Sequence, residues 1–282
     1  MTESAVPAPS DPAPRRPLAL SPSRAGDFRQ CPLLYRFRAI DRIPETPSRA
    51  QVRGTVTHTV LEQLFELPRP ERSPDRARAL VAPALDAALA ADPALAEVVP
   101  EAEREEFLAA IEPLLTHYFR IEDPSRFDPE SVEQRIETRI EDDLLLRGFI
   151  DRIDVAPTGE VRVVDYKTGK RPPERFQAQA LFQMKFYALM WWRTRGELPT
   201  QLLLIYLGDG TTLRHAPEAA ELERFEKVLT ALWDAIRTAG RTGDFPPRRS
   251  RLCDWCDHRA ICPEFGGTPP PYPGWPGETE IR

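Results

Sequence analysis

The sequence predicts an α/β fold in which a central mixed sheet is flanked by helices. A hairpin signal spans residues 144–167, where two runs rich in Val, Ile and Leu are separated by the turn residues Pro157, Thr158 and Gly159. An alternating segment, residues 131–141, precedes the hairpin and is typical of a half-buried strand. A helix pattern and a strongly apolar strand follow, which completes the strand, helix, strand succession of an α/β layer.

The length and composition are those of a globular protein with one sizeable core. Of the 282 residues, 41% are hydrophobic and 29% are charged, and no apolar stretch is long enough to span a bilayer, so we expect a cytoplasmic protein. The formal net charge of -6 argues against a uniformly basic surface that coats DNA. Arginines nevertheless cluster early and late in the chain, which suits a phosphate-binding groove and equally suits solvated helix faces.

The N-terminal half is predicted to be helical. Residues 1–17 are mostly Pro, Ala and Ser without periodicity and are expected to form a disordered tail. Ser21 is the expected cap of a first helix, and apolar spacing predicts further helices over residues 32–39, 50–67, 74–91 and 100–120. The last two have no recognisable chemical motif and are interpreted as a helical insertion of about residues 68–125.

The C-terminal half alternates strands and helices. After the hairpin we expect a helix, two strands around a Gly-Asp-Gly turn, and a long amphipathic helix, over residues 175–192, 201–207, 211–216 and 217–239. Residues 266–282 are rich in Pro and Gly and are expected to form a flexible tail, which leaves residues 18–265 as one domain.

The hairpin carries acids where strands normally carry apolar residues. If Val155 pairs with Val161, Asp151 faces Asp165 at roughly 5 Å, which destabilises the sheet unless a cation lies between them. Lys167 lies on the same face as Asp165, and it is one of few lysines in a chain that otherwise uses Arg. A solvated edge hairpin is the simple alternative. The Asp pair instead favours a Mg²⁺ or Mn²⁺ site.

The cysteines predict a second metal centre. Three of the four lie within ten residues in a Cys-x2-Cys-x5-Cys block, Cys253, Cys256 and Cys262, and the fourth is Cys31. In a cytosolic protein such clustering favours metal over disulfides. Zinc could use the Cys-x-x-Cys pair with Cys262 and either Cys31 or His258, whereas a 4Fe-4S cluster would use all four thiolates.

These motifs resemble those of the PD-(D/E)XK nucleases, in particular the RecB-type branch. The run Gly148-Phe-Ile-Asp151-Arg-Ile-Asp154 followed by Asp165-Tyr-Lys167 is similar to their catalytic hairpin, although Ile150 stands where the name has Pro. The cysteine pattern resembles that of AddB nuclease domains and CRISPR adaptation exonucleases. The resemblance covers residues 18–265, and its motifs are jointly specific although each alone is weak.

The resemblance implies a restriction-endonuclease-like fold whose cysteine segment, residues 253–262, joins the two termini. It implies that a 4Fe-4S cluster, rather than zinc, is held by Cys31, Cys253, Cys256 and Cys262. It also implies that Mg²⁺ or Mn²⁺ is bound by His58, Asp151, Asp165 and the Tyr166 carbonyl. Lys167 is the implied catalytic lysine, and the implied DNA-binding residues are Gln183 and Tyr187.

The function implied is a metal-dependent DNA exonuclease or endonuclease in recombination, repair or foreign-DNA processing. Single-stranded DNA or duplex ends are its expected partners. The sequence lacks a Gly-x4-Gly-Lys-Ser/Thr loop, so any helicase activity must come from a partner such as a helicase or recombination protein. The alternatives are a non-catalytic DNA-binding module and a zinc-bound structural module of the same fold.

Overall fold

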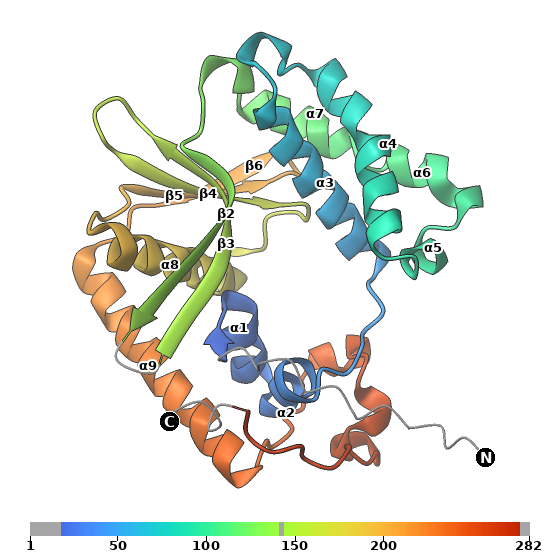
Figure 1. Cartoon of the computed structure of the whole chain (residues 1–282), viewed down its shortest axis with the longest axis vertical. Helices are drawn as coiled ribbons and strands as arrows, with labels where there is room; N and C mark the ends of the chain where they lie inside the picture. Colours follow the sequence, from blue (N-terminus) through green and yellow to red (C-terminus); the bar gives the residue numbers. More distant parts are fainter. Residues whose placement is uncertain (1–17, 141–143, 277–282) are drawn as a thin grey trace, which may run out of the picture.

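The computed structural model describes residues 18–140 and 144–276. Helices cover both faces of a six-stranded mixed sheet, as the sequence predicts (Figure 1). The predicted disordered tail, residues 1–17, and the last part of the predicted C-terminal tail, residues 277–282, lie outside the described residues. Among the residues that are described, no helix is both long and apolar enough to cross a membrane.

The sheet is built around one long strand, β3. Strand β2 pairs with β3 along its whole length, while β1 and β4 pair with different parts of its other edge; β5 and β6 extend the sheet beyond β4. The β4–β5 and β1–β3 pairs are parallel and the others are antiparallel. The strands are β1 (Ala19–Leu20), β2 (Ser131–Ile140), β3 (Leu144–Val155), β4 (Val161–Lys167), β5 (Gln201–Tyr206) and β6 (Thr211–His215).

The hairpin register is the predicted one. Val155 pairs with Val161 and the ladder continues to the pair of Arg152 with Val164. One step further the same register brings Asp151 level with Asp165. Gly159 in the turn has a φ of 98°, a left-handed conformation that favours glycine.

The helices begin at sequence signals but do not all continue as expected. Ser21, Ser48 and Ser73 cap α1, α3 and α4 with their side chains. The helices are α1 (Pro22–Gln30), α2 (Pro32–Tyr35), α3 (Arg49–Glu66), α4 (Pro74–Ala91), α5 (Leu95–Val98), α6 (Arg104–Ala109), α7 (Glu112–Ile121), α8 (Glu174–Arg195) and α9 (Ala219–Thr242).

Two predicted helices are wrong in extent. The helix expected over residues 100–120 is broken into α6 and α7, and Pro113 lies in the first turn of α7, where its missing N–H costs nothing. The helix expected over residues 32–39 is α2 followed by a π-helical turn, Arg36–Asp41, which ends at Arg42 with a φ of 54°.

The sheet separates two hydrophobic cores. Helices α1, α2, α8 and α9 pack on one face, and α3, α4 and α7 pack on the other (Figure 1). Strand β5 is apolar from Leu202 to Ile205 because it is buried on both faces: Leu202 and Leu204 enter one core, and Leu203 and Ile205 enter the other. The predicted helical insertion thus supplies much of the second core.

The chain beyond residue 266 packs on the domain as far as it is described. The Tyr272 hydroxyl donates a hydrogen bond to the Gly240 carbonyl at 2.6 Å, and the ring of Trp275 lies 6.2 Å from that of Trp233. Trp275 also leaves no room for a side chain at Gly240. The Pro- and Gly-rich composition predicts none of these contacts, because two aromatic side chains are enough to fix an otherwise irregular segment.

Candidate active site

Three acids lie in one row across neighbouring strands. The β2–β3 register pairs Val132 with Arg152 and Gln134 with Ile150, which brings Glu133 level with Asp151, just as the hairpin brings Asp165 level with Asp151. Glu133 has a φ of 45°, unusual for a residue other than glycine. The row is the centre of the candidate site.

Helix α3 adds His58 to this row. Val52, Val56 and Val60 bury one face of α3, which places His58 at the border of the core. Its Nδ1 lies 3.5 Å from Asp151 Oδ2 and 3.6 Å from Glu133 Oε1, and its Nε2 lies 3.1 Å from the Tyr166 carbonyl oxygen. Ligand atoms of His58, Glu133 and Asp151 all lie within 4.8 Å of one another.

Helix α8 approaches the row from the other face of the sheet and orients Lys167. Lys167 Nζ lies 2.8 Å from Asp165 Oδ2 and donates to Gln183 Oε1 at 2.9 Å. Gln183 Nε2 in turn donates to Asp165 Oδ1 and to the Tyr187 hydroxyl, both at 3.0 Å. Gln183 and Tyr187 meet because they are four residues apart on one helix.

The electrostatics of the site follow from burial and crowding of acids. Burial, and after it the charge of Asp165, raise the pKa of Asp151 to about 7. Burial alone would lower the pKa of His58, but the Glu133 hydrogen bond and the nearby carboxylates raise it to about 9. The pKa of Lys167 is likewise raised, because Asp165 outweighs the effect of burial. Even with His58 protonated, the three acids, when ionised, outnumber the two cations of the site, Lys167 and His58.

This donor set fits a divalent cation. Carboxylate oxygens, a main-chain carbonyl and an imidazole are ligands that Mg²⁺ or Mn²⁺ accepts, and a cation would offset the repulsion that raises the pKa of Asp151. Glu133 is not among the ligands that the sequence motifs predict. It reaches the site through the β2–β3 register, in the same way as Asp165 does through the hairpin register.

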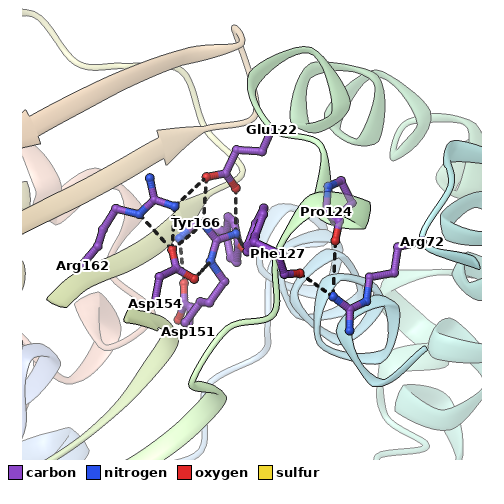
Figure 2. Close-up of polar contacts among 9 residues, drawn as sticks. Arg72, Glu122, Pro124, Phe127, Asp151, Asp154, Arg162 and Tyr166 are labelled. Atoms are coloured by element: carbon purple, nitrogen blue, oxygen red, sulfur yellow. Dashed lines mark hydrogen bonds and ion pairs between the residues drawn. The ribbon is translucent and has the colours of Figure 1, made fainter. Parts of the chain in front are cut away.

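A second charged cluster lies beside the site, on the opposite side of β3. Arg152 is fully buried and donates to both carboxylate oxygens of Glu122 at 2.7 and 2.8 Å. Asp154 Oδ1 lies 3.0 Å from Arg152 Nε, and Arg162 Nε donates to Asp154 Oδ2 at 2.9 Å. Figure 2 shows Glu122, Asp154 and Arg162 converging, so two acids meet two arginines in a balanced network.

Tyr166 connects this cluster to the active site. Its hydroxyl accepts a hydrogen bond from Arg152 Nη1 at 2.5 Å, while its main-chain N–H donates to Asp151 Oδ2 at 2.7 Å. Its side chain therefore belongs to one cluster and its peptide groups belong to the other (Figure 2). Residues 151, 152 and 154 form part of the Asp-Arg-Ile-Asp run, whose Arg and second Asp the sequence analysis left without a role.

The four cysteines lie together at the end of the domain away from the insertion. Cys31, Cys253, Cys256 and Cys262 line one cavity and form no disulfide. The Arg248 N–H donates to Cys31 Sγ at 3.4 Å, and the Ser250 N–H donates to Cys253 Sγ at 3.3 Å. His258, the alternative zinc ligand, has its Nε2 2.8 Å from Glu45 Oε1.

Comparison with solved structures finds the same fold elsewhere. The crystal structure of a "Putative exonuclease" from Eubacterium rectale is 12% identical, with a TM-score of 0.56, covering 86% of this chain and 89% of that one. A second chain, from the crystal structure of SSO0001, is 15% identical in sequence, with a TM-score of 0.42, and the match covers 87% of this chain and 86% of that one. A search of curated proteins gives no match.

The family comparison covers most of the chain. A family model described as "PD-(D/E)XK nuclease superfamily" matches residues 19–263, which include the acid row, Lys167, Gln183 and Tyr187. The match and the mixed sheet flanked by helices agree with the fold and the family that the sequence motifs predict. The chain therefore belongs to the PD-(D/E)XK nuclease superfamily.

Proposed function

We propose that this nuclease hydrolyses phosphodiester bonds of DNA with Mg²⁺ or Mn²⁺. The observation that carries the proposal is the row of buried acids, Asp151 level with Asp165, with Lys167 2.8 Å from Asp165. The three acids, when ionised, outnumber Lys167 and a protonated His58, and a divalent cation would offset this excess of negative charge. A degraded, non-catalytic site would have no reason to keep both acids and the lysine.

The roles follow from the positions of the side chains. Asp151, Asp165, His58 and the Tyr166 carbonyl would hold the ion, with Glu133 as an additional ligand. A bound divalent ion lowers the pKa of a coordinated water and polarises the scissile phosphate. Lys167 is held in place by Asp165 and Gln183 and can orient the attacking water and neutralise charge that develops on the phosphate. Gln183 and Tyr187 would contact the DNA strand.

Substitution at the acid row tests this proposal. Asp165→Ala and Lys167→Ala should each abolish Mn²⁺-dependent degradation of labelled DNA while the far-ultraviolet circular dichroism stays that of the wild type. Lys170→Ala is the matched control, since Lys170 is an exposed lysine in the loop after β4. Substrates blocked at the 5′ or 3′ end distinguish exonuclease from endonuclease cleavage and give its polarity. Full activity of Asp165→Ala would overturn the assignment.

The cysteine cavity supports a structural 4Fe-4S cluster as the second part of the proposal. All four thiols line one cavity, and main-chain N–H groups already donate to two of the sulfurs, as they do to cluster thiolates. Cys31 precedes the nuclease core and the other three follow it, so a cluster would join the termini. Anaerobic purification should give a brown protein whose visible absorption is lost in Cys256→Ser, whereas a colourless protein with stoichiometric zinc would overturn it.

The biological setting follows only from the sequence resemblance. It supports a role in DNA recombination, repair or foreign-DNA processing, alongside a helicase or recombination protein. These roles, and the cytoplasmic location, stay predictions. Affinity purification under mild conditions, with the Lys167→Ala variant as bait so that DNA substrates persist, would test whether a helicase co-purifies.

A further inference from the structure

A large groove lies between the N-terminal helix α1 and α8, beside the active site. Its volume is about 1040 Å³, and it is lined by α1, by α8 and by the middle of β3. Helix α1 lies beside α8 and the sheet at this end of the molecule (Figure 1). Gln183 and Tyr187 line it too, and Gln183 also contacts Asp165 and Lys167, so one side chain connects the wall of the groove to the acid row.

The groove is basic in a chain that is acidic overall. Its charged lining residues comprise one acid, Asp27, and five arginines, Arg24, Arg29, Arg38, Arg147 and Arg175, whereas the whole chain carries a formal charge of -6. Arg38 pairs with Asp27 and with Glu45, and Arg147 pairs with Glu137. With Glu45 and Glu137 counted beside Asp27, five arginines still face three acids, and this excess of positive charge suits a polyanion that follows the groove.

An exposed aromatic ring lies in this basic groove. Phe149 is 53% exposed, although its neighbour Ile150 is fully buried, because successive strand residues point to opposite faces. A side chain at Gly148 would come within 2.9 Å of the Tyr187 ring, so glycine there lets Tyr187 pack closely against β3. A second ring, Phe182, also lines the groove, and the Arg29 guanidinium lies 4.2 Å from its centroid.

Arginines interleaved with aromatic rings recognise unpaired nucleotides. Bases of a single strand can stack on an exposed ring while the phosphates meet guanidinium groups. The bases of a duplex are already stacked on each other and offer an exposed ring no free face. Phe149 therefore gains nothing from a duplex and would remain an exposed apolar side chain.

We propose that this groove binds single-stranded DNA, with Phe149 stacking on a base and leading the strand to the acid row. Only the delivery to the acid row rests on the proposed nuclease function. The binding itself needs no cleavage.

Fluorescence anisotropy in buffer without divalent metal tests the binding, with a labelled single-stranded DNA oligonucleotide, the same sequence as RNA, and the same sequence in a closed hairpin duplex. Phe149→Ala should weaken binding of the single-stranded DNA about tenfold. Val228→Ala is the matched control, because Val228 is 52% exposed on α9 and does not line the groove. It should bind as the wild type does.

The arginines are tested through salt dependence. Arg29→Ala should lower the slope of log affinity against log salt by about one. Arg224→Ala, an exposed arginine on α9 that does not line the groove, should leave the slope unchanged.

Different results would overturn single-strand binding by the groove and the proposed nuclease function. Wild-type affinity in Phe149→Ala, equal affinity for the hairpin duplex, or tighter binding of RNA would each overturn the groove assignment even if the protein cleaves DNA. Tight binding of single-stranded DNA that Phe149→Ala weakens, in a protein that cleaves no DNA with Mn²⁺, would support the groove and overturn the nuclease assignment instead.

Discussion

Two charged clusters share the hairpin, and consecutive residues of β3 belong to different ones. Arg152 lies in a cluster of two arginines and two acids, where Glu122 and Asp154 are paired with Arg152 and Arg162. Asp151 lies in a cluster of three acids that outnumber two cations, Lys167 and His58, and burial and the charge of Asp165 raise its pKa. Each cluster combines a buried residue, Asp165 or Arg152, with partly exposed ones, so burial does not distinguish them.

The balance of charge distinguishes a structural cluster from a functional one. A balanced network stabilises the fold once it is formed, and removing one member leaves its partners buried without a counter-charge. An unbalanced network costs stability until a ligand supplies the missing charge. The two clusters should therefore respond to substitution in opposite directions.

The largest effect is expected at Arg152. Arg152→Met should lower the free energy of unfolding by about 3 to 5 kcal/mol, because Glu122 and Asp154 lose their buried partner. Urea unfolding followed by circular dichroism measures this. Arg162→Met is the control in the same cluster: Arg162 is 34% exposed at its side chain, so its loss should cost about 1 kcal/mol or less. Equal losses would contradict the structural role assigned to Arg152.

Asp151→Asn should change the free energy of unfolding in the opposite direction and stabilise the protein. In metal-free buffer near pH 8 it should raise the free energy of unfolding by about 1 to 3 kcal/mol, since asparagine cannot ionise but can still accept from the Tyr166 N–H.

The stability difference between Asp151→Asn and the wild type should also depend on pH, and this dependence is a separate test of its direction. The pKa of the Asp151 carboxyl is 3.8 in a model peptide and about 7 in the folded protein, so folding opposes ionisation. Below about pH 4 both states are protonated and the variant should gain nothing. The gain should grow as the pH rises from about 4 to about 7 and then stay constant. Urea unfolding across this range measures it, and a gain that shrinks with rising pH would contradict the account.

The hairpin is the part of the candidate site that the sequence predicts best. Its register and the convergence of Asp151, Asp165 and Lys167 follow from strand periodicity and turn residues alone, because both act over a few residues. Helical spacing likewise places Gln183 and Tyr187 on one face of α8, but the contact of Gln183 with Lys167 was available only through the family resemblance. The approach of His58 to the acid row was available only through the family resemblance, since α3 lies far away in the sequence.

The Arg152 cluster could not be predicted in the same way. Its main acid, Glu122, follows α7 in the helical insertion, and its rings include Phe65 and Phe127, so its partners are fixed only when the insertion packs on the sheet. The packing of Trp275 on α9 has the same origin. Local patterns carry no information about contacts that tertiary packing creates.

A smaller effect is expected at Glu133. Glu133→Gln should weaken Mn²⁺ binding about tenfold, because the ion loses one charged ligand but keeps the other residues. Isothermal titration calorimetry measures the affinity without any need for activity. Glu62→Gln is the matched control, since Glu62 lines the same cavity as Glu133 but is not in the group with ligand atoms within 4.8 Å. Equal effects of the two substitutions would remove Glu133 from the ligand set.

The smallest effect is expected at Tyr166, where the two clusters meet. Tyr166→Phe removes only the hydroxyl that accepts from Arg152 and should cost about 1 kcal/mol of unfolding free energy. The affinity for Mn²⁺ should stay that of the wild type, because the main-chain groups that face Asp151 and His58 remain. A large loss of Mn²⁺ affinity would show that the clusters act as one.

Thermal melting of the wild type and Asp151→Asn, each with and without Mn²⁺, tests the central claim that the acid row is a divalent-metal site. Mn²⁺ should raise the melting temperature of the wild type, because an ion that binds only the folded state stabilises it. Asp151→Asn should melt higher than the wild type without Mn²⁺ and should gain nothing when Mn²⁺ is added. An unchanged wild-type melting temperature, or an equal gain in both proteins, would contradict the claim.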